Sequence, residues 1–154
     1  MAVTVDIQQA YSGFVPSTQS IQSWVGLALK EVAEDCELSI RLVGENESAD
    51  LNLTYRGKKG PTNVLSFPFN TSVELEPRLL GDLVICVPVV EREAKAQAKA
   101  VEHHWAHMVI HGCLHLLGYD HIKDEQAKEM EALEIDILDL LTISDPYKEQ
   151  GAEL

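Results

Sequence analysis

The sequence predicts a single domain that combines four β-strands with about five helices. Three observations lead to this prediction. The chain has 154 residues, which is the length of one domain with one hydrophobic core. Some stretches alternate apolar and polar residues, as strands do, whereas others repeat apolar residues at helical spacing. No internal repeat, low-complexity tract or linker divides the sequence, so we expect one domain over residues 1–154.

The first half of the chain predicts two strands and two helices in alternation. Residues 3–7 alternate apolar and polar side chains and therefore predict a strand. A helix follows over residues 16–32, because a Pro-Ser-Thr start precedes apolar residues at i, i+3 and i+4 spacing. Residues 38–42 alternate again and predict a second strand. Ser48 is expected to cap a short helix that ends at Gly57.

The second half predicts two further strands and three helices. Residues 64–69 and 83–87 are short apolar runs joined by a polar connection of hairpin-like length, so we expect adjacent strands. Residues 89–99 are rich in Glu, Ala, Lys and Gln and predict a solvated helix. Residues 102–117 are apolar on most sides, which is typical of a buried central helix. The last helix, 124–141, begins with an aspartate that is expected to cap it.

The charge of the chain is unevenly distributed. The formal net charge of −13 counts against nucleic acid as a partner, because polyphosphate binding draws on basic surface. Ten of the acids lie between Lys123 and Leu154, and we expect those of the last helix to face water. From Leu53 to Phe69 the balance reverses, since this segment contains no acid and three cations: Arg56, Lys58 and Lys59. An arginine there can grip two oxygens of a phosphate at once.

Composition and chain start indicate a cytoplasmic protein without a membrane association. No run of about 18 apolar residues exists, and the first residues lack the basic start and apolar stretch of a secretory signal. The three cysteines, Cys36, Cys86 and Cys113, are odd in number and widely spread, which argues against a disulfide framework. We expect them to be buried, reduced thiols, with Cys113 in the core.

Three histidines have the spacing of a metal site. His111 and His115 are one helical turn apart and can bind one ion together. A straight helix rises about 1.5 Å per residue, so it cannot bring a third histidine to the same ion. Gly118 can adopt positive φ, end the helix and return His121 toward the pair. The spacing therefore predicts a zinc site formed by His111, His115 and His121 at the end of the central helix.

The same spacing occurs in the metzincin proteases, with one difference. Their motif carries a glutamate after the first histidine, and that glutamate is the general base. Gly112 stands at this position, so the base is missing. Three nitrogen ligands leave a fourth coordination position open, which is the pattern of a catalytic zinc site rather than a closed structural one.

Other polar residues near the histidines have two possible roles each. Asp82 and Asp120 can each hold an imidazole N–H beside the metal or simply form a turn. We expect the remaining histidines, His103, His104 and His107, on polar faces or interfaces, although His107 can orient a metal ligand.

Three blocks of the chain resemble the YbeY family of bacterial endoribonucleases. They are residues 55–68, 80–85 and 111–121, in the family's order and spacing. The resemblance implies a single α+β domain with a mixed sheet, one zinc ion on the three histidines, and single-strand-specific RNA cleavage. It also implies a role in ribosomal RNA maturation, notably at the 3′ end of the small-subunit RNA, and in ribosome quality control. Asn63 and Cys86 depart from the family pattern, which commonly has Asp and Ser there.

The resemblance assigns Arg56 to the arginine that steadies the scissile phosphate. Either hydroxide or the RNA's own 2′-OH can then attack the phosphorus. The implied partners are single-stranded RNA and the small ribosomal subunit with its proteins, with no DNA expected. Two rival functions stay open: a zinc peptidase, and a non-catalytic ribosome assembly factor in which zinc only staples the helix end.

Overall fold

The structure is a computed structural model of the 154-residue chain and describes residues 2–70, 73 and 75–147. Its described part contains four strands in one sheet of order β1-β2-β4-β3. The first three strands in this order are parallel, whereas β3 runs antiparallel to β4, so the sheet is mixed. The strands are β1 (Val3–Gln9), β2 (Cys36–Val43), β3 (Val64–Pro68) and β4 (Arg78–Cys86).

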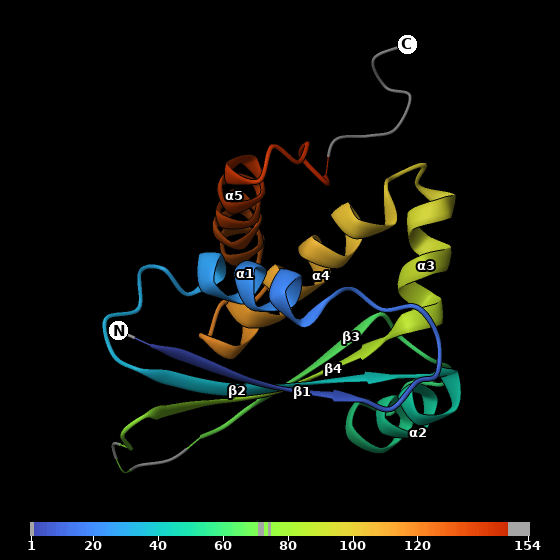
Figure 1. Ribbon diagram of the computed structural model, residues 1–154, viewed down its shortest axis with the longest axis horizontal. Coiled ribbons are helices and arrows are strands. Elements are labelled where there is room, and N and C mark those ends of the chain that lie inside the picture. Colours follow the sequence, from blue (N-terminus) through green and yellow to red (C-terminus); the bar gives the residue numbers. More distant parts are fainter. Residues whose placement is uncertain (1, 71–72, 74, 148–154) are drawn as a thin grey trace.

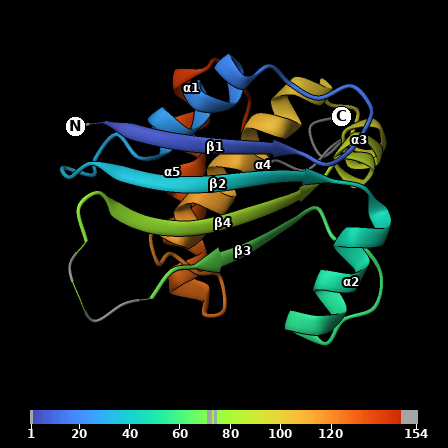
Figure 2. The same ribbon diagram turned by 60° about the horizontal axis from the view of Figure 1, so that its bottom comes forward.

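Five helices accompany the sheet in the described residues, and the predicted single α+β domain is confirmed. Helices α1 and α4 lie on one face of the sheet, with α5 packed on α4, while α2 lies at one end of the opposite face (Figure 1). Figure 2 shows α2 extending past the β3 edge of the sheet. The helices are α1 (Thr18–Ala28), α2 (Glu45–Arg56), α3 (Val87–Ala96), α4 (Val101–Leu116) and α5 (Asp124–Leu140).

The main hydrophobic core lies between the sheet and helices α1 and α4. Helix α4 is buried on most sides because it contacts β3, β4 and the helices α1, α3 and α5. This confirms the buried central helix predicted from its apolar sequence. A smaller core cluster lies on the opposite face of the sheet, where α2 packs, and extends to the first turn of α3; it contains Val43, Leu65, Val84, Cys86 and Val89. All three cysteines are buried and free, as expected.

Two predicted helix caps are wrong. Helix α2 begins at Glu45 after Gly44, so Ser48 lies inside the helix rather than at its start. The Ser48 side chain is buried and instead exchanges hydrogen bonds of 3.0 Å with the carbonyl and N–H of Thr62, which fixes the loop before β3. Helix α5 is preceded by Lys123 and has no side-chain cap. Asp124 is its first residue, where the negative carboxylate interacts favourably with the positive end of the helix dipole.

Other local signals agree with the structure. Ser17 caps α1 by accepting a hydrogen bond from the N–H of Ser20 at 3.1 Å. Gly57 has φ +67 and ends α2, as the sequence predicts. Among the described residues there is no helix that is both long and apolar enough to cross a membrane.

Candidate metal centre

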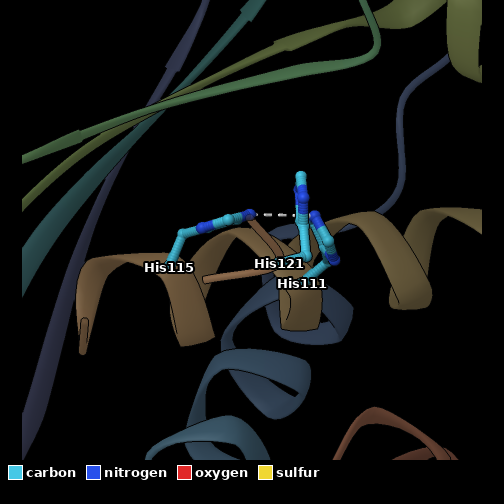
Figure 3. Close-up of side chains that lie close together, drawn as sticks. All are labelled: His111, His115 and His121. Carbon is cyan, nitrogen blue, oxygen red and sulfur yellow. Dashed lines mark hydrogen bonds between the residues drawn. The ribbon is translucent and has the colours of Figure 1, made fainter. Parts of the chain in front are cut away.

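The three predicted ligands come together at the end of α4. His111 and His115 lie one turn apart on this helix, which ends at Leu116. Gly118 then has φ +104, a conformation that glycine adopts at little cost, and the chain turns back so that His121 faces the pair (Figure 3). One nitrogen from each imidazole lies within 4.8 Å of the other two.

The spacing of the imidazole nitrogens fits a tetrahedral ion. The Nε2 atoms of His111 and His115 are 3.1 Å apart. Zinc–nitrogen bonds of about 2.0–2.1 Å at tetrahedral angles would place two such nitrogens about 3.3 Å apart. His111 and His115 are partly buried and His121 is exposed, so one side of the cluster is open. The donor set of three imidazole nitrogens therefore suits one tetrahedral metal ion with a free coordination position.

The protonation state of His115 also favours metal binding. Burial, together with the neighbouring His111 and His121, lowers the pKa of His115 to about 4, against a smaller opposing effect of Asp120. The imidazole is therefore neutral at pH 7 and can bind a metal ion without first losing a proton.

A buried glutamate contacts the cluster, and the expectation that it faces water was wrong. Glu134 of α5 was expected to face water with the other acids of this helix, but its exposed fraction is 0%. Its Oε1 accepts hydrogen bonds from Nδ1 of His111 at 2.7 Å and Nε2 of His107 at 2.8 Å. Its Oε2 accepts a hydrogen bond of 2.7 Å from the hydroxyl of Tyr147.

The carboxylate of Glu134 is ionised. Burial alone would raise its pKa, but the hydrogen bonds from His107 and His111 outweigh burial and lower the pKa to about 2. A helical signal could have revealed its position, because Met130, Glu134 and Ile137 share the buried face of α5. That pattern does not tell which residues it meets.

The other histidines of α4 differ from expectation. His104 and His107 are buried rather than on a polar face, with exposed fractions of 2% and 7%, while His103 is exposed as predicted. The Nε2 of His104 bonds Glu93 at 2.9 Å. His107 and His111 hydrogen-bond the same oxygen of Glu134, and the orienting role of His107 stays a prediction.

Neither aspartate considered as a support for the imidazoles has that role among the described residues. Asp82 bonds the hydroxyl of Ser39, its register partner on β2. Its neighbour Leu83 faces α4, so Asp82 points to the opposite side of the sheet. Asp120 accepts a hydrogen bond of 2.7 Å from the backbone N–H of His121 and so forms the turn.

Gly112, which replaces the glutamate of the proteases, faces the sheet rather than the metal ligands. A Cβ atom at this position would lie 2.8 and 2.9 Å from the two methyl carbons of Leu83 on β4. Glycine therefore lets α4 approach the sheet closely. A glutamate side chain here would start against Leu83 and point toward the sheet, which disfavours this position for a general base beside the histidines.

A cavity of about 450 Å³ adjoins His111. Glu93 on its wall accepts hydrogen bonds from Nδ2 of Asn63 at 3.1 and 3.2 Å and from His104. Asn63 thus acts as a donor to a carboxylate, a role that the aspartate common in the YbeY family could fill only when protonated. Lys99 also lines the cavity, and burial lowers its pKa below the usual value.

Among the described residues, Arg56 is not part of the hydrogen-bond network around the histidines. It is the last residue of α2, and its side chain is exposed. In the described part of the chain, the side chains of Arg56, Lys58 and Lys59 form no hydrogen bond or ion pair. The neighbouring Tyr55 packs edge-on against Phe67 of β3, with ring centroids 5.1 Å apart. The cation is therefore free to bind an anionic ligand, but its catalytic role stays a prediction.

Fold and site define a class: an α+β protein with a three-histidine metal centre where a buried helix turns back on itself. A sequence comparison matches residues 6–142 to the family described as Endoribonuclease YbeY. The solution structure of TM1509 from Thermotoga maritima is similar to this chain, with 26% identity and a TM-score of 0.64, and the match covers 98% of this chain and 99% of that one. The chain belongs to the YbeY family, a metal-dependent family of endoribonucleases that act in ribosomal RNA maturation.

Proposed function

We propose that residues 1–154 form one zinc-dependent endoribonuclease domain that cuts single-stranded RNA. In this proposal the protein works in the cytoplasm, matures the 3′ end of the small-subunit ribosomal RNA and takes part in ribosome quality control. The observation that carries the proposal is the three-histidine cluster, with two Nε2 atoms 3.1 Å apart, in a chain of the YbeY family.

We assign the metal to zinc on the chemistry of its donors. His111, His115 and His121 offer three nitrogens, and within the described part of the chain no carboxylate or thiolate completes the set, which suits zinc better than magnesium or calcium. Bound there, zinc would supply a Lewis acid for the phosphodiester and acidify water in its open position.

The chain's own residues would do the remaining work. Arg56 would grip the non-bridging oxygens of the scissile phosphate and stabilise the charge that develops on them. The cavity beside His111 would receive part of the strand next to the cleavage point, with Lys99 as a local cation. Which group takes the proton from the attacking oxygen stays open between hydroxide and 2′-OH pathways. A 2′,3′-cyclic phosphate product would indicate attack by the 2′-OH.

The strong negative charge of the chain affects which partners we propose. With a formal net charge of −13, long-range attraction of RNA is unfavourable. Free cations are gathered at the end of α2, where Arg56, Lys58 and Lys59 are exposed. We therefore infer that the small ribosomal subunit and its proteins deliver the RNA. DNA and membranes are not proposed as partners.

The same charge favours one alternative, a non-catalytic ribosome assembly factor in which zinc only stabilises the turn after α4. A peptidase is disfavoured by the contact between position 112 and Leu83.

One experiment separates these functions. Zinc-loaded, chelated and His115→Ala proteins are compared for cleavage of a single-stranded RNA carrying the 3′ end of the small-subunit RNA. His103→Ala is the matched control, because His103 is an exposed histidine on the same helix. The proposal predicts cleavage by the zinc-loaded wild type and by His103→Ala only. If His115→Ala binds no zinc yet processes the RNA normally with ribosomes present, the assembly-factor function is correct.

A further inference from the structure

We propose that Glu134 and Tyr147 are positioning residues that set the orientation and tautomer of His111 for the metal ion. The inference rests on the proposed metal site, since it concerns how one of its three ligands is held. Glu134 is on α5 and Tyr147 follows this helix, so both are distant in sequence from the histidine block.

Both nitrogens of the His111 ring have a defined neighbour. Its Nδ1 lies 2.7 Å from Oε1 of Glu134, and its Nε2 lies 3.1 Å from Nε2 of His115. Tyr147, His107 and His111 surround the two carboxylate oxygens as hydrogen-bond partners, so the carboxylate is the shared acceptor and the geometry assigns the His111 proton to Nδ1. The lone pair is then on Nε2, which faces the other ligands. Such a carboxylate–histidine contact fixes the ring of a metal ligand and raises its basicity.

Tyr147 holds the second oxygen of the same carboxylate. Its hydroxyl donates a hydrogen bond of 2.7 Å to Oε2, while Oε1 accepts from His107 and His111. The Tyr147 ring also packs edge-on against the His107 ring, with centroids 5.4 Å apart. The carboxylate is thus fixed by α4 on one side and by the segment after α5 on the other. Loss of the hydroxyl would leave Oε2 without this donor and free the carboxylate to rotate.

The burial of Glu134 indicates that this arrangement is specific. An ionised carboxylate with an exposed fraction of 0% is costly unless each oxygen is hydrogen-bonded. The three donors meet that requirement. His107, His111 and Glu134 also have the proximity of a metal-binding group, but their separations of 2.7 and 2.8 Å are ordinary hydrogen-bond distances. We therefore assign the glutamate to support of one ion and not to a second ion.

Zinc affinity tests the proposal. Wild type, Glu134→Ala, Glu134→Gln and Tyr147→Phe are titrated with zinc in competition with a chromophoric chelator. Loss of such a supporting group typically weakens metal binding about 10- to 100-fold, and we expect this for Glu134→Ala. Glu134→Gln should lose less, because its amide oxygen can still accept from His111. Tyr147→Phe should also lose less, because it removes only a donor to the carboxylate. Asp136→Asn, an exposed acid on the same helix, is the control and should bind as wild type.

Spectroscopy separates positioning from a purely structural role. The visible spectrum of the cobalt-substituted protein should change in Glu134→Ala and Tyr147→Phe, and nitrogen NMR of the metal-free wild type should show the His111 proton on Nδ1. Tyr147→Phe keeps the ring, so the test survives if Glu134→Ala fails to fold. Lower stability with unchanged zinc affinity and cobalt spectrum in both variants would overturn the proposal, as would binding of two zinc ions per chain.

Failure of the proposed function has a different signature. If the wild type cuts no RNA but the zinc affinities still fall as expected, the positioning role stands without the nuclease. If His115→Ala binds zinc as tightly as wild type, the metal site itself is wrong.

Discussion

Replacing Gly112 with alanine is expected to lower the free energy of unfolding, although alanine is the better helix former. In the middle of a helix, alanine is favoured over glycine by about 1 kcal/mol. Against this gain, the new Cβ would lie 2.8 and 2.9 Å from the methyl carbons of Leu83 and 3.4 Å from its Cγ. Leu83 is fully buried, so it cannot move into solvent. Overpacking of this kind costs about 1–3 kcal/mol, which leaves a net loss of about 0–2 kcal/mol.

Urea unfolding of the metal-free protein measures this loss, because zinc would otherwise add its own binding energy to the folded state. Gly26→Ala is the matched control. Gly26 lies on α1 with no atom within 4 Å of its Cβ position, so only the helical gain of about 1 kcal/mol is expected there. The two variants should therefore differ by the overpacking cost of about 1–3 kcal/mol. Equal stabilisation by both substitutions would refute the argument that Gly112 lets α4 approach β4.

The Leu83→Ala background provides a second check on the same contact. Removing the Leu83 methyl groups removes the clash, so Gly112→Ala should be stabilising in that background and the two substitutions should couple. The same contact also bears on peptidase activity. Gly112→Glu should not cleave casein, because the first carbon of the new side chain would lie against the sheet and direct the carboxylate away from the histidines. Casein cleavage by this variant would return the peptidase to consideration.

Three further predictions concern the site, the thiols and the acid stability. Arg56→Ala should keep wild-type zinc affinity yet lower the rate of RNA cleavage about 10²- to 10³-fold, as loss of one donor to developing charge does, while Lys58→Ala changes it far less; equal rates for the two variants would remove Arg56 from the mechanism. Burial raises the pKa of Cys113 to about 12, so a thiol reagent at pH 8 should leave it unmodified by mass spectrometry until the protein unfolds. Burial would raise the pKa of Glu93, but hydrogen bonds from His104 and Asn63 lower it below the usual value. Its contribution to stability is therefore present above the unfolded pKa and lost as pH falls through the folded pKa, so Glu93→Gln should flatten the acid limb of unfolding free energy against pH. An unchanged acid limb would contradict this.

The clustering of the three histidines could be predicted because their geometry is local. His111 and His115 are neighbours on any helix, and the φ of +104 at Gly118 is a conformation that its residue type already allows. The third histidine, His121, follows within three residues of that turn. Strand alternation and helical spacing are also local properties, so the single α+β domain with four strands and five helices agreed with prediction.

The supporting residues could not be predicted, because they depend on how distant elements pack. Glu134 is 23 residues from His111, and only the packing of α5 on α4 makes it a hydrogen-bond acceptor instead of a solvated acid. Ser48 has the residue type of a helix cap, but the loop from α2 to β3 supplies it with better partners at Thr62. Leu83 contacts Gly112 because one face of β4 packs against α4. Asp82 lies on the other face of the strand and points away from α4.

The sequence by itself determined that the three histidines cluster at the end of the central helix, since residue type and spacing along one helix and one turn are sufficient for this. The tertiary structure decided which residues contact those histidines. Burial of a charge is tolerated only where several donors converge on it, and at Glu134 these donors come from α4 and from the segment after α5. Such convergence is a property of packing that no local pattern contains.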